Sequence, residues 1–143
     1  MKRIALIAHD QMKSELIKFV NEHLEFFRGV ELVGTGHTGA LVEETTHLRV
    51  KRYLSGPLGG DQQIGAQIAS GKIDAVFFFR DPLTPQPHEP DITALLRLCD
   101  VHYVPAATNP ATGKAIIRGL ENSWALLPSK SDEKGVVLEK KSE

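Results

Sequence analysis

Short, uninterrupted apolar runs alternate with longer segments whose apolar residues recur at three- and four-residue spacing, and this alternation constrains the fold most strongly. An uninterrupted apolar run is typical of a strand that is buried on both faces, as strands of a parallel sheet are. The longer segments are typical of helices that cover such a sheet. We expect strands over residues 4–8, 30–33, 50–54, 73–79 and 103–107.

The amphipathic segments separate these runs and connect each strand to the next. Strands that alternate with helices in this way predict an α/β fold with a parallel sheet. We expect helices over residues 12–24, 40–44, 64–68, 91–99 and 112–120. The charged residues 121–143 lack clear periodicity, so we expect one domain over residues 1–120 and an extension that is at most partly ordered.

The charge and cysteine content of the chain exclude several classes of protein. The formal net charge is −1, which gives no electrostatic reason to expect nucleic acid or an anionic membrane as a partner. Cys99 is the only cysteine and has no partner for an internal disulfide, as is usual in a reducing compartment. The apolar runs are far shorter than the roughly 20 residues of a membrane span. We therefore expect a cytoplasmic protein without a membrane anchor.

Polar and glycine-rich residues follow each predicted strand. Ligands of open parallel sheets bind beyond the carboxyl ends of the strands, so these residues are predicted to share one edge of the sheet. They are His9, Asp10 and Lys13, then residues 34–39, residues 55–61, then Asp81, His88, Glu89 and Asp91, and finally Thr108 and Asn109.

The two glycine-rich turns within this set suit an anion. Glycine lets backbone N–H groups approach a phosphate closely, and a helix that begins there adds partial positive charge. Residues 34–39 formally spell G-x-G-x-x-G, but the acidic residue expected about 20 positions later is missing, so we disfavour a dinucleotide. Either turn could also be ordinary loop structure.

Several carboxylates and imidazoles in the set could move protons. A carboxylate can remove a proton next to a carbonyl group, and an imidazole can relay protons between oxygens. The alternatives are structural: Asp81 and Asp91 could cap local structure, Asp61 could simply open a helix, and His9 could be a buried, satisfied side chain. A metal bound by His and Asp also remains open, although the spacing is not that of the zinc helix motif.

Taken together, three motifs resemble the methylglyoxal synthase family. They are Thr-Gly-His-Thr-Gly at 35–39, Ser-Gly-Pro-Leu-Gly-Gly-Asp at 55–61 and Pro-His-Glu-Pro-Asp at 87–91, and the likeness extends over about residues 3–120. The resemblance implies a three-layer, doubly wound α/β fold with five parallel strands, and a homohexamer. It also implies conversion of dihydroxyacetone phosphate to methylglyoxal and inorganic phosphate, without a metal or organic cofactor and with phosphate as an allosteric inhibitor.

The same resemblance implies a role for each residue of the set. Asp61 would be the base that removes the C3 proton, and His88 would contact the substrate oxygens and move a proton. Asp81 and Asp91 would support them, with His9 and Asp10 nearby. The phosphate would be bound by Lys13, Thr35, His37, Thr38, Ser55 and Gly56.

The sequence departs from the family pattern at two places. His37 stands where the family usually has threonine, and no arginine follows Arg118 to serve as the phosphate ligand that some members take from a neighbouring subunit. Arg97 is a candidate replacement for that ligand. The first departure keeps a second hypothesis open, a binding module that senses a phosphorylated or nucleotide metabolite.

Overall fold

Five strands form one sheet in which every neighbouring pair is parallel, as the sequence predicts. The computed structural model describes residues 1–126. The strands are β1 (Arg3–Ala8), β2 (Glu31–Thr35), β3 (Val50–Tyr53), β4 (Ala75–Phe79) and β5 (Ala106–Ala107). Their order in the sheet is β3-β2-β1-β4-β5, so the chain runs outward in both directions from a central pair, β1 and β4.

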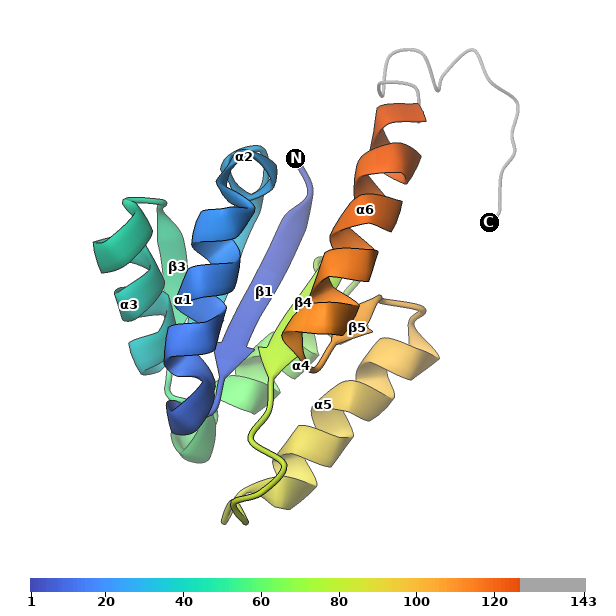
Figure 1. The fold of residues 1–143 in the computed structure, drawn as a ribbon. Helices are drawn as coiled ribbons and strands as arrows, with labels where there is room; N and C mark the ends of the chain where they lie inside the picture. The colour runs from blue at the N-terminus through green and yellow to red at the C-terminus, as the bar shows by residue number, and fades with distance from the viewer. Residues whose placement is uncertain (127–143) are drawn as a thin grey trace.

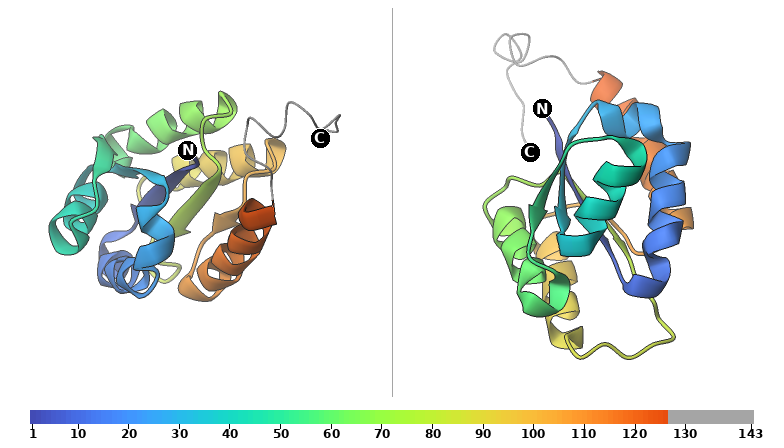
Figure 2. Two further views of the ribbon diagram at one scale, coloured as in Figure 1. Left: turned by 90° about the horizontal axis from the view of Figure 1, so that it is seen from above. Right: turned by 90° about the vertical axis from the view of Figure 1, so that its left-hand side faces the viewer.

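Helices cover both faces of the sheet and complete a three-layer, doubly wound fold (Figures 1 and 2). The helices α1 (Lys13–Glu22), α2 (Leu24–Arg28), α3 (Gly36–Thr46) and α6 (Pro110–Leu126) pack on one face. On the other face lie α4 (Gly60–Ala69) and α5 (Glu89–Val101). Two short 3₁₀ turns, Asp10–Met12 and Gly56–Leu58, precede α1 and α4.

The continuous apolar runs exist because successive residues of each central strand enter different cores. Along β1, Ile4 and Leu6 belong to the core under α1 and α6, whereas Ile7 belongs to the core under α4 and α5. Phe77 and Phe78 of β4 divide in the same way, and both are fully buried. Burying such a side chain contributes about 1.5–3 kcal/mol, so these strands anchor both layers.

The two helices of the second core approach each other closely. Ile64 and Ile68 of α4 and Leu95 of α5 share that core, and the two helices are in contact. A Cβ added at Gly65 would lie 3.1 Å from Leu98 Cδ1. The small residue therefore allows the close approach.

The helix predicted over residues 12–24 corresponds to α1, and the short helix α2 that follows it was not predicted. At His23 the backbone leaves the helical region, with φ −124° and ψ 34°, and separates α1 from α2. The His23 ring nitrogen Nδ1 lies 2.9 Å from the carbonyl oxygen of Phe19 in the last turn of α1. The imidazole thus satisfies a carbonyl that the helix end would leave unpaired.

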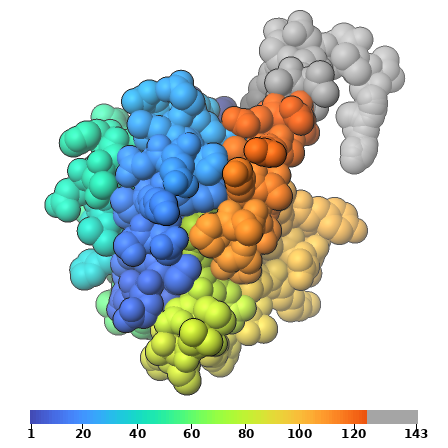
Figure 3. Space-filling model, viewed as in Figure 1, coloured from blue at the N-terminus to red at the C-terminus, as the bar shows by residue number. Residues whose placement is uncertain are grey.

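The last helix is longer than the predicted 112–120 and continues to Leu126, so the start of the expected extension is helical. Trp124 stacks on Phe26 of α2, with ring centroids 5.7 Å apart and planes inclined by 15°. This contact explains why the helix continues where the sequence pattern fades. Figure 3 shows α1 and α6 together on this face, with the loop after β4 below them. Residues 127–143 lie outside the described residues.

The remaining differences are shifts of element ends. The helix predicted over 40–44 begins at Gly36, and the one over 64–68 begins at Gly60, so both glycine-rich turns lead directly into helices. Among residues 1–126, none of the helices combines the length and apolar character that crossing a membrane requires.

Candidate active site

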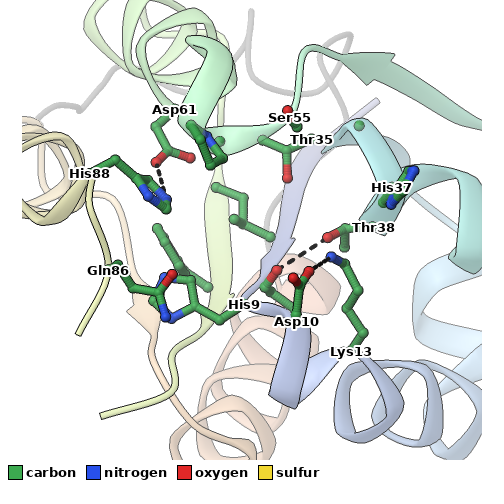
Figure 4. Close-up of a pocket in the computed structure, with 16 residues that line it drawn as sticks. His9, Asp10, Lys13, Thr35, His37, Thr38, Ser55, Asp61, Gln86 and His88 are labelled. Carbon is green, nitrogen blue, oxygen red and sulfur yellow. Dashed lines mark hydrogen bonds and ion pairs between the residues drawn. The ribbon is translucent and has the colours of Figure 1, made fainter. Parts of the chain in front are cut away.

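A cavity of about 380 Å³ lies beyond the carboxyl ends of the central strands (Figure 4). Ile7 and Phe78 contribute apolar lining from the sheet. Of the predicted site residues, all except Asp81 and Asp91 line this cavity. These residues are His9, Asp10, Lys13, Thr35, His37, Thr38, Ser55, Gly56, Asp61 and His88.

Buried polar side chains are concentrated at this cavity. Apart from Thr46, each buried polar residue among residues 1–126 lines it, namely His9, Thr35, Thr38 and Asp61. Both carboxylate oxygens of Asp61, the Nε2 atom of His9 and the Nδ1 atom of His88 are buried without a hydrogen-bond partner. Buried polar atoms are normally paired, so these atoms are candidates for ligand contacts.

Asp61 and His88 face each other in the cavity, and both side chains are largely buried. Asp61 lies in the first turn of α4 with 1% of its surface exposed, and His88 directly precedes α5. The distance from His88 Nε2 to Asp61 Oδ2 is 3.6 Å. Burial raises the pKa of Asp61, the negative charge of Asp91 raises it further, and His88 opposes this rise. A carboxylate with a raised pKa is a stronger proton acceptor than an exposed one.

His9 lies beside this pair, and a hydrogen bond from the backbone of Asp81 holds its ring in place. Its ring centroid is 5.9 Å from that of His88 and 5.3 Å from that of Phe78. The backbone N–H of Asp81 donates to His9 Nδ1 at 2.9 Å. Burial lowers the pKa of His9, and the positive charges of His88 and Arg80 lower it further. The lowered pKa favours the neutral form of the imidazole.

The other end of the cavity suits an anion (Figure 4). Lys13 forms an ion pair with Asp10, and the Lys13 hydrogen bond holds the pKa of that carboxyl below its ordinary value. Thr38 lies in the first turn of α3, where backbone N–H groups have no partner within the helix. His37 is exposed at the rim of the cavity. An anion bound here would meet an ammonium group and a helix N-terminus.

Gly56 leaves open the space beside Asp61 and His88. A Cβ added at this residue would lie 3.1 Å from His88 Nε2 and 3.2 Å and 3.3 Å from the two Asp61 carboxylate oxygens. Only glycine keeps this position free for a ligand that reaches the ionisable pair.

Asp81 and Asp91 lie next to the cavity but do not line it. Asp91 occupies the first turn of α5, from which its charge acts on Asp61. Asp81 lines a second cavity of about 570 Å³, together with Arg80 and Glu89. Both aspartates follow β4, as predicted, but the Asp81 carboxylate accepts a hydrogen bond within its own turn and lines the second cavity.

Gln86 lines the first cavity from the proline-rich loop after β4 and was not predicted as a site residue. A lone glutamine among prolines carries no recognisable pattern, so nothing in the sequence singled it out. Arg80 was also missed, although it follows β4 directly and its Nε atom is buried without a partner. Among residues 1–126, no group of three or more His, Cys, Asp or Glu side chains is arranged to hold a metal ion.

Comparisons with known proteins agree with the motifs. Residues 15–108 match the model of the MGS-like domain family. A methylglyoxal synthase from Moorella thermoacetica is 61% identical over 120 residues, which cover 84% of this chain and 94% of the relative. One from Clostridium botulinum strain Alaska E43 is 59% identical over 116 residues, covering 81% of this chain and 98% of the relative.

A solved structure supports the same relationship. The crystal structure of a methylglyoxal synthase from Elizabethkingia anophelis matches with a TM-score of 0.77 and 47% sequence identity. The match covers 81% of this chain and 76% of that chain. The fold, the motifs and the relatives agree, and the chain belongs to the methylglyoxal synthase family.

Proposed function

We propose that this chain converts dihydroxyacetone phosphate to methylglyoxal and inorganic phosphate. The observation that carries the proposal is the Asp61 carboxylate, which is buried beside His88 and has no hydrogen-bond partner in a cavity whose other end suits a phosphate. The names of the relatives support a synthase of methylglyoxal, and the chemistry of the cavity supports this substrate.

In the proposed reaction Asp61 removes a proton from C3, and the electron pair moves to the C2 carbonyl oxygen to give an enediolate. His88 moves a proton between the two oxygens of this intermediate. The C1–O bond then breaks and phosphate leaves with its bonding electrons, which yields the enol of methylglyoxal. This enol tautomerises to the product. The sum is one substrate to one methylglyoxal and one hydrogen phosphate, so no oxidant, reductant or water is consumed.

The decisive experiment mixes the purified protein with dihydroxyacetone phosphate and EDTA, then follows inorganic phosphate and a trapped dicarbonyl together. We expect both products in equal amounts. Phosphate without dicarbonyl would indicate a phosphatase and contradict the elimination. Neither product, with phosphate binding retained, would favour the sensor hypothesis, and activity only in the absence of EDTA would indicate metal-dependent chemistry.

The anion end predicts the effect of removing Lys13. Lys13→Ala is expected to raise KM for dihydroxyacetone phosphate about 10- to 100-fold, because a hydrogen bond to a charged group contributes about 1.5–3 kcal/mol. Steady-state kinetics would measure it, with Lys18→Ala as the control because Lys18 is an exposed residue of the same helix. An unchanged KM would remove Lys13 from the phosphate site.

The raised pKa of Asp61 predicts a pH dependence that Asp91 modulates. The base must be ionised, so kcat/KM should rise with pH through a midpoint above the ordinary aspartate value of 3.8. Asp91→Asn removes a negative charge that raises the pKa of Asp61, so the midpoint should move to lower pH. Asp100→Asn, an exposed charge near the other end of α5, is the control. A midpoint that stays in place in Asp91→Asn would contradict the assignment.

We also infer from the family a cytoplasmic homohexamer that needs no cofactor and that phosphate inhibits as product and allosteric ligand. Light scattering coupled to size exclusion would measure the number of subunits. Activity measured against phosphate at several substrate concentrations would separate simple competition from cooperative inhibition.

A further inference from the structure

The side chain of Asp81 is occupied within its own loop. Its Oδ1 atom accepts the backbone N–H of Leu83 at 3.0 Å, which closes a turn across Pro82. Hydrogen bonds from the Thr84 side chain and from the Leu83 backbone hold the pKa of Asp81 below its ordinary value. Because this carboxylate lines the second cavity and not the first, it is not placed to meet the reacting atoms.

The backbone of Asp81 reaches the candidate active site instead. Its N–H donates to Nδ1 of His9, so that nitrogen must carry a lone pair. In a neutral imidazole the proton then resides on Nε2. This atom is buried without a hydrogen-bond partner, and His9 lines the cavity. The opposite tautomer would place two N–H groups against each other.

We propose that Asp81 is a positioning residue whose side-chain turn aims its backbone N–H at His9, and that His9 is thereby fixed as an Nε2–H donor toward a substrate oxygen. The identity of that oxygen rests on the proposed function. A neutral donor stabilises an enediolate without first needing to gain a proton. The charged or titratable groups that act on His9 are His88, Arg80, Glu89 and Asp81 itself.

Two substitutions at one position separate this role from that of a charged or acid–base group. Asparagine keeps the oxygen that closes the turn, whereas alanine removes it. Asp81→Ala is expected to lower kcat about 10- to 100-fold through misplacement of His9. In Asp81→Asn the rescued turn should keep kcat within about threefold of the original protein. Equal losses in both variants would assign the effect to charge and overturn the proposal.

A spectroscopic measurement on the free protein tests the tautomer without using activity. Nitrogen-15 NMR of the imidazole side chains, with His9 identified by its absence in His9→Gln, should show the neutral Nε2–H form. Asp81→Asn should retain this signature, and Asp81→Ala should show a mixture of tautomers. An Nδ1–H form in the original protein would overturn the proposal even if the enzyme were fully active.

The two proposals can fail separately. If the tautomer is as expected but dihydroxyacetone phosphate gives no product, the proposed function fails and the positioning of His9 stands. Thermal unfolding of each variant checks that the loop substitution has not unfolded the domain, and Asp100→Ala serves as the control for loss of a carboxylate elsewhere on the surface.

Discussion

Asp61→Asn is expected to lower turnover of dihydroxyacetone phosphate by about 10²–10⁴-fold, the usual contribution of a positioned general base. Asparagine has nearly the same shape, so the cavity and the contact with His88 are kept while the proton acceptor is lost. The measurement is kcat from the coupled phosphate and dicarbonyl assay. Activity within a few-fold of the original protein would exclude Asp61 as the base.

The stability of the same variant provides an internal check. Burial raises the pKa of Asp61 in the folded state, so the folded chain binds this proton more tightly than the unfolded chain does. The free energy of unfolding therefore falls as pH rises from about 3.8, the ordinary value, through the raised folded-state pKa. At pH 7 Asp61→Asn should be at least as stable as the original protein, and this advantage should disappear in acid. Denaturant unfolding at several pH values measures it.

Gly56→Ala is expected to lower kcat/KM by about 100-fold or more, since small misplacements of reacting groups have effects of this size. The added methyl group would lie 3.1 Å from His88 Nε2 and 3.2 Å from Asp61 Oδ1, within the space that the proposed substrate would enter. Both partners are largely buried and have little room to move. Kinetics with dihydroxyacetone phosphate would measure the loss.

Gly119→Ala is the matched control, because a Cβ added at Gly119 meets nothing within 4 Å and the residue lies inside α6. It should leave kinetics unchanged and stabilise the domain by roughly 0.5–1 kcal/mol, since alanine favours a helix over glycine. If Gly56→Ala behaved like this control, the proposed substrate would not occupy the space beside Gly56.

The sheet could be predicted from the sequence because burial on both faces leaves an unmistakable pattern in the strands. Residues 75–79 read Ala-Val-Phe-Phe-Phe, and such a short run, rich in aromatic residues, is typical of a strand between two cores. Helix ends were harder to predict. The end of α1 depends on the His23 imidazole, which contacts the Phe19 carbonyl of the same helix. The last turns of α6 depend on the stacking of Trp124 on Phe26. Such contacts are local or tertiary events that periodicity does not encode.

The site was predictable to the extent that topology determines it. The carboxyl ends of parallel strands bring His9, Thr35, Ser55 and Asp61 into one cavity, whatever the details of the loops. The direction of an individual side chain after a strand is a matter of turn geometry. Asp81 is the example, because the turn that its carboxylate closes across Pro82 turns that group toward the second cavity.

The close contact between α4 and α5 has a consequence for the chemistry. Asp61 lies in the first turn of α4 and His88 directly precedes α5, so the gap between carboxylate and imidazole is set by how near the two helices lie. Gly65, one turn beyond Asp61, permits that nearness by meeting Leu98 without a side chain of its own. We expect a bulkier residue at position 65 to push α4 away from α5. The distance between Asp61 and His88 would then increase, although the new side chain would not enter the cavity. We therefore expect the packing of α4 against α5, at Gly65 and Leu98 outside the cavity, to influence the reaction rate.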